Sequence, residues 1–231
     1  MKWRGLEESI PGQQAATLRE ELEERKALAA QYVPEDVQQV NRHTVEQLAA
    51  LGMAGRILAV GASAPRFELP DQDGKPVSSH ELLSHDRLVI CFFRGRWCPF
   101  CVGQMEAMNS ALSQIEKTGA RLVAISPQTT KQGFFMRDQH HLRFPLLSDA
   151  GNQVARQFGL VYRVPDEQKQ VYSRTFVNLP FLNGEASWEL PIPATYILER
   201  DGRVLYASAD PDYTRRPEPQ EVVGLLDQFA A

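Results

Sequence analysis

The sequence predicts an α/β domain with a central mixed β-sheet, helices covering both of its faces, and an N-terminal helical extension. From residue 87 onward, short apolar runs rich in β-branched residues alternate with helical stretches, as in strands joined by crossover helices. Residues 88–93 are all apolar, which is typical of a central strand buried on both faces. Residues 1–55 are instead charge-rich and nearly free of β-branched runs. We therefore expect an N-terminal helical arm or cap over residues 1–55 and the main domain over residues 56–231.

Two helices account for the arm. The charged residues of the first are most simply a solvated helix face, and its apolar stripe consists of Leu18, Leu22, Leu28 and Tyr32. The second helix begins at Pro34, because proline is favoured at the first position of a helix, and it ends at Gly52. Two interpretations of the apolar stripes stay open, namely packing against the main domain and a dimer contact.

The first half of the main domain follows the predicted alternation of strands and helices. Residues 64–77 form a short strand, an Asp-Gly turn and a second short strand. After the central strand and its helix, residues 121–126 form another buried strand, and a helix runs from about Thr130 to His140. Residues 144–149 form a strand at the edge of the sheet.

The second half closes the domain. A helix starts at Asp149 or Asn152 and ends at Gly159. Strands at residues 194–198 and 204–207 precede a last helix, which carries Val222, Val223, Leu225, Leu226 and Phe229. Between the helix that ends at Gly159 and the strand that starts at residue 194, residues 160–191 exceed the usual length of a loop and are rich in aromatic residues. They either wall a substrate groove or form a hairpin over residues 178–189 that turns at Asn183-Gly184.

The segment from Arg94 to Cys101 is the centre of the predicted site. It joins the central strand to a helical stripe, so the sulfurs of Cys98 and Cys101 lie in the first turn of a helix. Unpaired amide hydrogens and the helix dipole favour a thiolate there. With two residues between them, the cysteines can close a small disulfide ring, which Pro99 stiffens. Because of its place at the helix start, Cys98 is predicted to have the lower thiol pKa, since Cys101 lies deeper.

Other uses of the two cysteines, as zinc ligands or as inert buried thiols, are weaker interpretations. Four-coordinate zinc needs more ligands, and the sequence has no second Cys-x-x-Cys and no His-x-x-x-His. We therefore expect a redox pair that requires no metal and no cofactor. Arg94 and Arg96 would lower the thiol pKa if they face the sulfurs. Cys91 is read as a small core residue, and the five histidines as solvated surface residues.

Composition excludes several classes of partner. A net charge of −4 over 231 residues provides no basic surface for nucleic acid or for an anionic membrane. No apolar stretch reaches the roughly 18 residues of a membrane helix, and the first eight residues lack the apolar core of a signal peptide. Three cysteines do not indicate a structural disulfide framework. We expect a cytoplasmic protein whose partner is a small molecule or another soluble protein.

An ordered series of short segments resembles a known family. Residues 61–69, the strand leading to Cys98, residues 122–127 and residues 144–149 resemble the peroxiredoxin family (alkyl hydroperoxide reductase and thiol-specific antioxidant), which has a thioredoxin fold. The resemblance covers about residues 58 to 228.

The cysteine motif departs from that family. Peroxiredoxins carry Pro-x-x-x-Thr-x-x-Cys, whereas this chain has Arg94 at the proline, Cys98 at the threonine and Cys101 at the peroxidatic cysteine. With Trp97 before Cys98, the motif Trp-Cys-Pro-Phe-Cys instead resembles the thioredoxin pattern.

A second departure lies before a late strand. The segment containing Ile192 and Pro193 resembles the Ile-cis-Pro entry of thioredoxins, and Pro193 occupies the place where peroxiredoxins have an activating arginine. We expect a cis peptide bond there, with the backbone of Ile192 pairing with an extended thiol substrate beside Cys98. The alternative is an ordinary trans proline before an edge strand.

The resemblance implies a thiol-dependent antioxidant oxidoreductase that cycles a Cys98–Cys101 disulfide. As a thiol peroxidase, Cys101 would attack peroxide and Cys98 would resolve the sulfenic acid; as a thiol-disulfide oxidoreductase, Cys98 would attack a disulfide. The expected reductant is an external thiol of the thioredoxin or glutathione type, and a homodimer is possible. The residues expected to bind or activate the substrate are Arg94, Arg96, Trp97, Pro99, Ile192 and Pro193. The alternative is a redox-responsive interaction module with little turnover.

Overall fold

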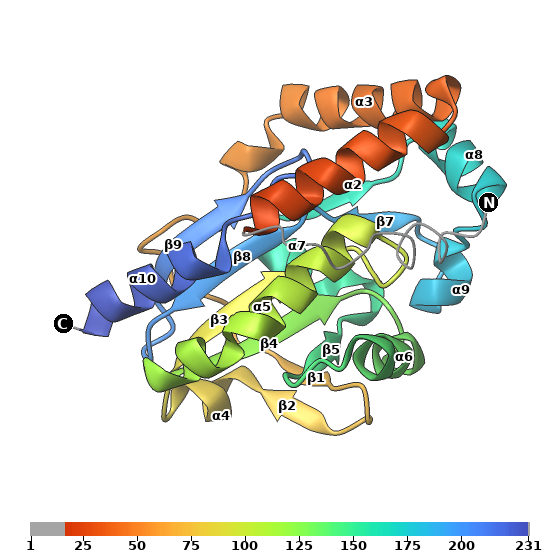
Figure 1. Ribbon diagram of the computed structural model, residues 1–231. Helices are drawn as coiled ribbons and strands as arrows, with labels where there is room; N and C mark the ends of the chain where they lie inside the picture. Colours follow the sequence, from red (N-terminus) through yellow and green to blue (C-terminus); the bar gives the residue numbers. More distant parts are fainter. Residues whose placement is uncertain (1–16, 231) are drawn as a thin grey trace.

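The computed structural model describes residues 17–230 and has a five-stranded mixed sheet at its centre (Figure 1). The strand order is β5-β4-β3-β8-β9. The strands are β3 (Arg87–Phe92), β4 (Ala120–Ser126), β5 (Leu146–Ser148), β8 (Ala194–Leu198) and β9 (Val204–Ala209). β3, β4 and β5 are parallel, and β8 and β9 run antiparallel to their neighbours. The predicted mixed sheet is confirmed.

The central strand β3 is buried on both faces, as its apolar run predicts. Successive side chains of a strand point to opposite faces of the sheet. Leu88, Ile90 and Phe92 accordingly belong to one core cluster, and Val89, Cys91 and Phe93 to the other. Cys91 is therefore a core residue, as expected.

Helices cover both faces of the sheet, and Figure 1 shows α2, α5, α6 and α10 together on one of them. These helices are α2 (Leu18–Tyr32), α5 (Pro99–Lys117), α6 (Thr130–His140) and α10 (Pro219–Ala230). The core on the other face receives side chains from α3 (Glu35–Ala50), α4 (Ser79–Leu83), α7 (Gln153–Gln157), α8 (Asp166–Arg174) and α9 (Leu179–Asn183). None of the helices within residues 17–230 has the length and apolar character needed to cross a bilayer.

Two small antiparallel strand pairs complete the structure. β1 (Glu68–Pro70) and β2 (Pro76–Ser78) form the predicted hairpin, with Gly74 in the left-handed region at φ 78°. β6 (Val161–Arg163) pairs with β7 (Glu189–Pro191). Short 3₁₀ turns occur at Met53–Gly55 and Ala150–Asn152.

The expected hairpin over residues 178–189 is wrong. Residues Leu179–Asn183 form helix α9, and Asn178 caps it by accepting a hydrogen bond from the Phe181 N–H at 3.1 Å. Gly184 has φ 72° and ends the helix. Asn-Gly supplies a left-handed residue in both settings, so the dipeptide alone does not separate a hairpin turn from a helix C-terminus. Residues 160–191 are thus two short strands and two helices rather than a long loop.

The two helices of the arm form as predicted and pack on the main domain. The Thr17 hydroxyl accepts from the Glu20 N–H at 3.2 Å, and the Glu20 carboxylate accepts from the Thr17 N–H at the same distance, which makes a capping box. α3 begins one residue later than expected, because Pro34 is its N-cap. Leu22 of α2 is buried against α5, and Leu48 of α3 joins the core on the other face of the sheet. Residues 1–16 of the arm lie outside the described residues.

Candidate active site

The two cysteines lie where a parallel strand ends and a helix begins. After β3, the chain crosses the carboxyl edge of the sheet, and α5 starts at Pro99. Cys98 is the N-cap of α5 in an extended conformation, and its carbonyl accepts from the Cys101 and Val102 N–H groups at 3.0 Å each. The predicted placement of both sulfurs in the first turn is therefore confirmed.

A glycine shapes the loop before the motif. Gly95 has φ 144°, and a Cβ atom added there would lie 2.7 Å from Trp97 Nε1. Only glycine adopts this positive φ and leaves room for the Trp97 side chain without strain. The loop conformation brings the side chain of Arg94 back to the cysteine that follows it, as the next contact shows.

Two arginines touch the two sulfurs. Arg94 Nη2 lies 3.0 Å from Cys98 Sγ, and Arg216 Nη2 lies 3.8 Å from Cys101 Sγ. Both cysteines are free thiols with 0% exposure, and Arg94 is only 4% exposed. Arg216 comes from the segment between β9 and α10, 115 residues after Cys101. The site is therefore a buried dithiol between two guanidinium groups.

Aromatic rings surround the Arg94 guanidinium. Its Cζ lies 3.8 Å from the centre of the Tyr213 ring and 4.9 Å from that of Trp97, and Nη1 lies 3.5 Å from the Tyr172 hydroxyl. Within residues 17–230, no carboxylate forms an ion pair with Arg94 or Arg216. A buried cation without a counter-ion is costly, so a thiolate is the anion that this site is built to hold.

The pKa values of the two thiols are shifted in opposite directions. Burial raises the pKa of the Cys98 thiol, and the hydrogen bond that its S–H donates to Cys101 raises it further, well above the usual range despite Arg94. Burial also opposes ionisation of Cys101, but the hydrogen bond from Cys98 and the charges of Arg216 and Arg94 outweigh it. The pKa of Cys101 is therefore held well below its usual range.

This order corrects the expectation that Cys98 has the lower pKa. Position along α5 alone favours the thiolate at Cys98. In the structure both thiols are fully buried, the Cys98 thiol donates a hydrogen bond to Cys101, and Arg216 lies 3.8 Å from Cys101. Since this contact joins distant parts of the chain, the spacing of the motif could not reveal it.

The other predicted residues of the motif have separate roles. Arg96 extends toward α6, where its guanidinium donates to Gln132 Oε1 at 3.4 Å and its backbone N–H donates to Gln128 Oε1 at 2.9 Å. These two contacts are with Gln132 of α6 and with Gln128 in the segment before it. Trp97 packs edge-on against Tyr172 at 5.1 Å between ring centres. Pro99 is the first residue of α5.

The expectation for Ile192 and Pro193 is wrong. The described residues contain no cis peptide bond, so the bond between these two residues is trans. The Ile192 N–H donates to the Leu160 carbonyl at 2.8 Å, continuing the pairing of β6 with β7. The extended pairing fixes the backbone, and this N–H is therefore occupied and is not open to a substrate.

His140 differs from the expected solvated residue. Its Nδ1 lies 2.9 Å from Glu106 Oε1, and its side chain is 11% exposed. Glu106 also pairs with Arg25 of α2 at 3.3 Å. Burial opposes ionisation of Glu106, but the hydrogen bond with His140 and the charge of Arg25 lower its pKa.

Across residues 17–230, no group of three or more His, Cys, Asp and Glu residues could hold a metal ion.

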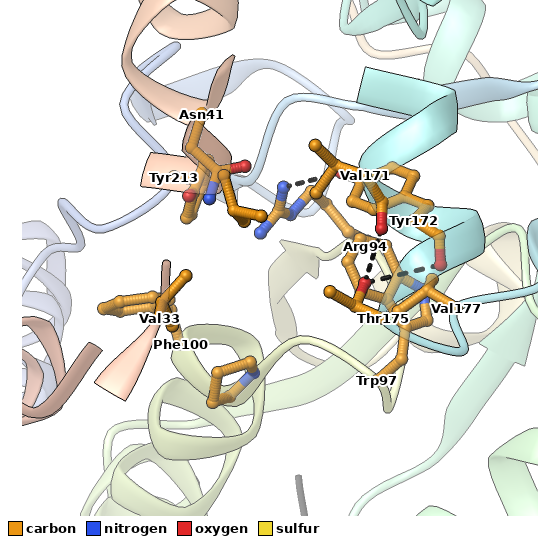
Figure 2. A pocket seen from close by; sticks show the side chains of 12 residues that line it. Val33, Asn41, Arg94, Trp97, Phe100, Val171, Tyr172, Thr175, Val177 and Tyr213 are labelled. Carbon is orange, nitrogen blue, oxygen red and sulfur yellow. Dashed lines mark hydrogen bonds between the residues drawn. The ribbon is translucent and has the colours of Figure 1, made fainter. Parts of the chain in front are cut away.

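A cavity of about 60 Å³ lies beside Arg94 (Figure 2). This volume is large enough to hold water or one small solute. Figure 2 shows the Arg94 guanidinium reaching into it between Tyr172 and Tyr213. Most of its walls are apolar, and the lining residues are Val33, Val37, Asn41, Arg94, Trp97, Pro99, Phe100, Val171, Tyr172, Thr175, Val177 and Tyr213. The arm supplies the first three.

Cys91 should remain unreactive while the dithiol reacts. Its sulfur is fully buried 3.9 Å from Thr195 Oγ1, and burial raises the pKa of its thiol to about 12. Because only thiolates alkylate readily, native protein treated with iodoacetamide at neutral pH should carry no label on Cys91. Peptide mapping before and after unfolding checks this, and native labelling of Cys91 as fast as that of Cys101 would refute it.

Comparison with known proteins establishes the family. Residues 60–207 match the model of the AhpC/TSA family. The chain belongs to this family. As a member it is a thiol-dependent oxidoreductase, and the resemblance drawn from the sequence segments is confirmed. The described arm, residues 17–55, lies outside the matched region.

Named relatives agree with this assignment. A Mycobacterium tuberculosis protein named as a peroxiredoxin is 29% identical over 150 residues, which are 65% of this chain and 84% of that protein. Peroxiredoxin Bcp of Escherichia coli K12 is 31% identical over 103 residues, which are 45% of this chain and 65% of that protein. The crystal structure of the peroxidoxin BcpB from Mycobacterium tuberculosis matches with a TM-score of 0.59 and 22% identity, covering 74% of this chain and 98% of that one. The last similarity supports the expected thioredoxin-type fold.

Proposed function

We propose that this protein is a thiol peroxidase in which Cys101 attacks the peroxide and Cys98 resolves the product. One observation carries the proposal. Cys101 accepts the hydrogen bond of the Cys98 thiol and lies beside Arg216, within a site that has two guanidinium groups and no paired carboxylate. An activated thiol requires such a cationic environment.

The first chemical step forms a sulfenic acid. The Cys101 thiolate attacks one oxygen of a hydroperoxide, the O–O bond breaks, and Cys101 becomes the sulfenic acid. The leaving alkoxide or hydroxide takes up a proton and departs as an alcohol or water. Arg94 and Arg216 stabilise negative charge as it moves from sulfur to oxygen, because both guanidinium groups lie beside the sulfurs.

The second step closes the disulfide. Cys98 loses its proton and attacks the sulfenic sulfur of Cys101, the S–O bond breaks, and the oxygen leaves as water. The two thiols have then supplied the two electrons that reduce the peroxide. An external dithiol, or two monothiols, returns two electrons and two protons and is itself oxidised to a disulfide.

The class of reductant and the cellular compartment follow from the need to reduce the Cys98–Cys101 disulfide after each turnover. We place the protein in a reducing compartment such as the cytoplasm, since a dithiol that cycles needs a continuous supply of reduced thiols. Thioredoxin-like and glutathione-like donors are the two classes of reductant to compare.

A homodimer stays a proposal, and the buried apolar residues of α2 and α3 already pack within one chain.

Peroxide consumption tests the proposal. With a small dithiol as electron donor, the protein should consume hydrogen peroxide catalytically, and peptide mapping of the oxidised form should find a Cys98–Cys101 disulfide. Turnover of an insulin-type disulfide without peroxide turnover would favour the thiol-disulfide oxidoreductase. Disulfide formation without turnover of either substrate would favour the redox-responsive interaction module.

A further inference from the structure

The arm crosses the same end of the molecule as the dithiol. α2 packs against α5, the helix that carries the cysteine motif, and α3 packs against α8. The arm contributes Val33, Val37 and Asn41 to the lining of the cavity beside Arg94, and Figure 2 shows Val33 and Asn41 there. The arm therefore packs on both α5 and α8 and forms one wall of the cavity beside Arg94.

The first attachment of the arm reaches the cysteine motif itself. Arg25 Nη1 of α2 donates to the carbonyl of Pro99, between the two cysteines, at 2.7 Å. Its Nη2 pairs with Glu21 at 2.5 Å and with Glu106 of α5 at 3.3 Å. α2 also lies very close to α5 here, because a Cβ atom on Gly103 would be 3.0 Å from Glu21 Oε1.

Two further attachments hold the rest of the arm. The carboxylate of Glu218 accepts from the Leu18 N–H at 3.0 Å and from the Arg19 N–H at 2.8 Å, which caps the start of α2. On α3, the Thr44 hydroxyl donates to Gln168 Oε1 of α8 at 3.0 Å. Apolar contacts hold the arm as well, since Leu18 and Leu22 of α2 and Leu48 of α3 are buried in the two core clusters. The polar attachments are the ones that single substitutions can release without opening the core.

The closed arm forms part of the wall of the cavity beside the dithiol. Both cysteines are fully buried, and the neighbouring cavity measures about 60 Å³. A hydroperoxide of a few atoms fits such a space. A folded protein that presents a disulfide or dithiol needs contact over roughly 800 Å² of surface, so it cannot reach the sulfurs while the arm is in place.

We propose that the N-terminal arm determines the specificity of the dithiol, with Arg25 and Glu218 as its latches. The closed arm admits small hydroperoxides and excludes protein thiols and disulfides. Opening of the arm admits the protein dithiol that reduces the Cys98–Cys101 disulfide, giving up two electrons and two protons and becoming a disulfide. The catalytic part of this inference rests on the proposed peroxidase function, whereas the gating part concerns access to the thiols alone.

Alkylation with two sizes of one reagent tests the gate. The reduced protein is treated with N-ethylmaleimide and, separately, with a maleimide carried on a polyethylene glycol chain, and the rate of labelling at Cys98 and Cys101 is measured by mass spectrometry. In Arg25→Met, the labelling rate with the bulky maleimide, divided by the labelling rate with N-ethylmaleimide, should rise at least about tenfold. The reason is that a charged hydrogen bond that holds the closed state is lost. The bulky reagent reports the population of the open state.

Two more variants make the result specific. Glu218→Ala loosens the other end of α2 without touching the motif, and it should raise the same ratio. Arg42→Met is the matched control, because Arg42 lies on α3, is 53% exposed and pairs with Glu35 of its own helix. The labelling ratio of this variant should equal that of the unmodified protein. An unchanged ratio in both latch variants, or an equal rise in Arg42→Met, would overturn the proposal.

Turnover then separates this inference from the proposed function. In the latch variants, the rate of disulfide reduction by a thioredoxin, relative to the rate of hydrogen peroxide consumption with a small dithiol, should rise. A fall in this relative rate would contradict the gate. If no variant consumes peroxide, the peroxidase function fails, while the alkylation ratio still decides whether the arm covers the thiols.

Discussion

Replacing Cys101 by serine should abolish peroxide turnover, whereas Cys98→Ser should retain the first chemical step. Removing the nucleophile should lower the rate of peroxide reduction by at least about a thousandfold, since binding and electrostatic effects alone replace little of a covalent step. Cys98→Ser lacks the resolving thiol, so it should consume one equivalent of peroxide and then stop with Cys101 as the sulfenic acid.

Single-turnover kinetics check this pair of variants. Each reduced protein is mixed with one equivalent of hydrogen peroxide, and the loss of peroxide is followed. Cys91→Ser is the matched control, because Cys91 is a buried thiol in the same strand-to-helix unit and takes no part in the mechanism. A burst of peroxide consumption in Cys101→Ser that is absent from Cys98→Ser would reverse the assignment of roles.

Arg216→Met should slow the attack on peroxide and raise the pKa of Cys101. The guanidinium lies 3.8 Å from Cys101 Sγ, and its charge lowers the pKa of that thiol. Removing the charge raises this pKa. At any pH between the Cys101 pKa of the unmodified protein and that of the variant, the variant therefore contains less thiolate. Since one charged donor lost from such a site can cost about a hundredfold, we expect a rate reduction between about tenfold and a hundredfold.

The neighbouring arginine is the natural control for this experiment. Arg215 is 73% exposed and pairs with Asp210 and Asp212 rather than with a sulfur. Arg215→Met should therefore keep both the rate and the pH profile of alkylation, whereas Arg216→Met should move the profile of Cys101 to higher pH. Equal effects of the two substitutions would indicate a general disturbance of the segment before α10 rather than loss of a charge beside the thiol.

Much of the fold follows from local patterns in the sequence. The apolar run of β3 predicts burial on both faces, and its side chains divide between the two core clusters as the strand period requires. The helix predicted over Thr130 to His140 has the same bounds in the structure. These features are decided by residues close together in the chain, which is why local periodicity predicts them.

The candidate site could be predicted only in part. The motif placed Cys98 and Cys101 at a helix start, and Arg94 contacts Cys98 four residues away. Arg216, Tyr213 and Arg25 reach the site from distant segments, and no local spacing marks them.

Short motifs with two structural uses account for the wrong expectations. Asn183-Gly184 ends a helix here, although the same dipeptide forms hairpin turns. The peptide bond between Ile192 and Pro193, before β8, is trans, and the Ile192 N–H pairs with the Leu160 carbonyl. The surrounding chain decides between the two uses in each case, and that information is not local.

Locating the first sulfenic acid tests the central claim most directly. Cys98→Ser and Cys101→Ser are each treated with less than one equivalent of hydrogen peroxide in the presence of a dimedone-type trap, and the adduct is mapped by mass spectrometry. The account predicts an adduct on Cys101 in Cys98→Ser and little adduct on Cys98 in Cys101→Ser. An adduct on Cys98 in Cys101→Ser, with none on Cys101 in Cys98→Ser, would contradict it and make Cys98 the thiol that attacks peroxide.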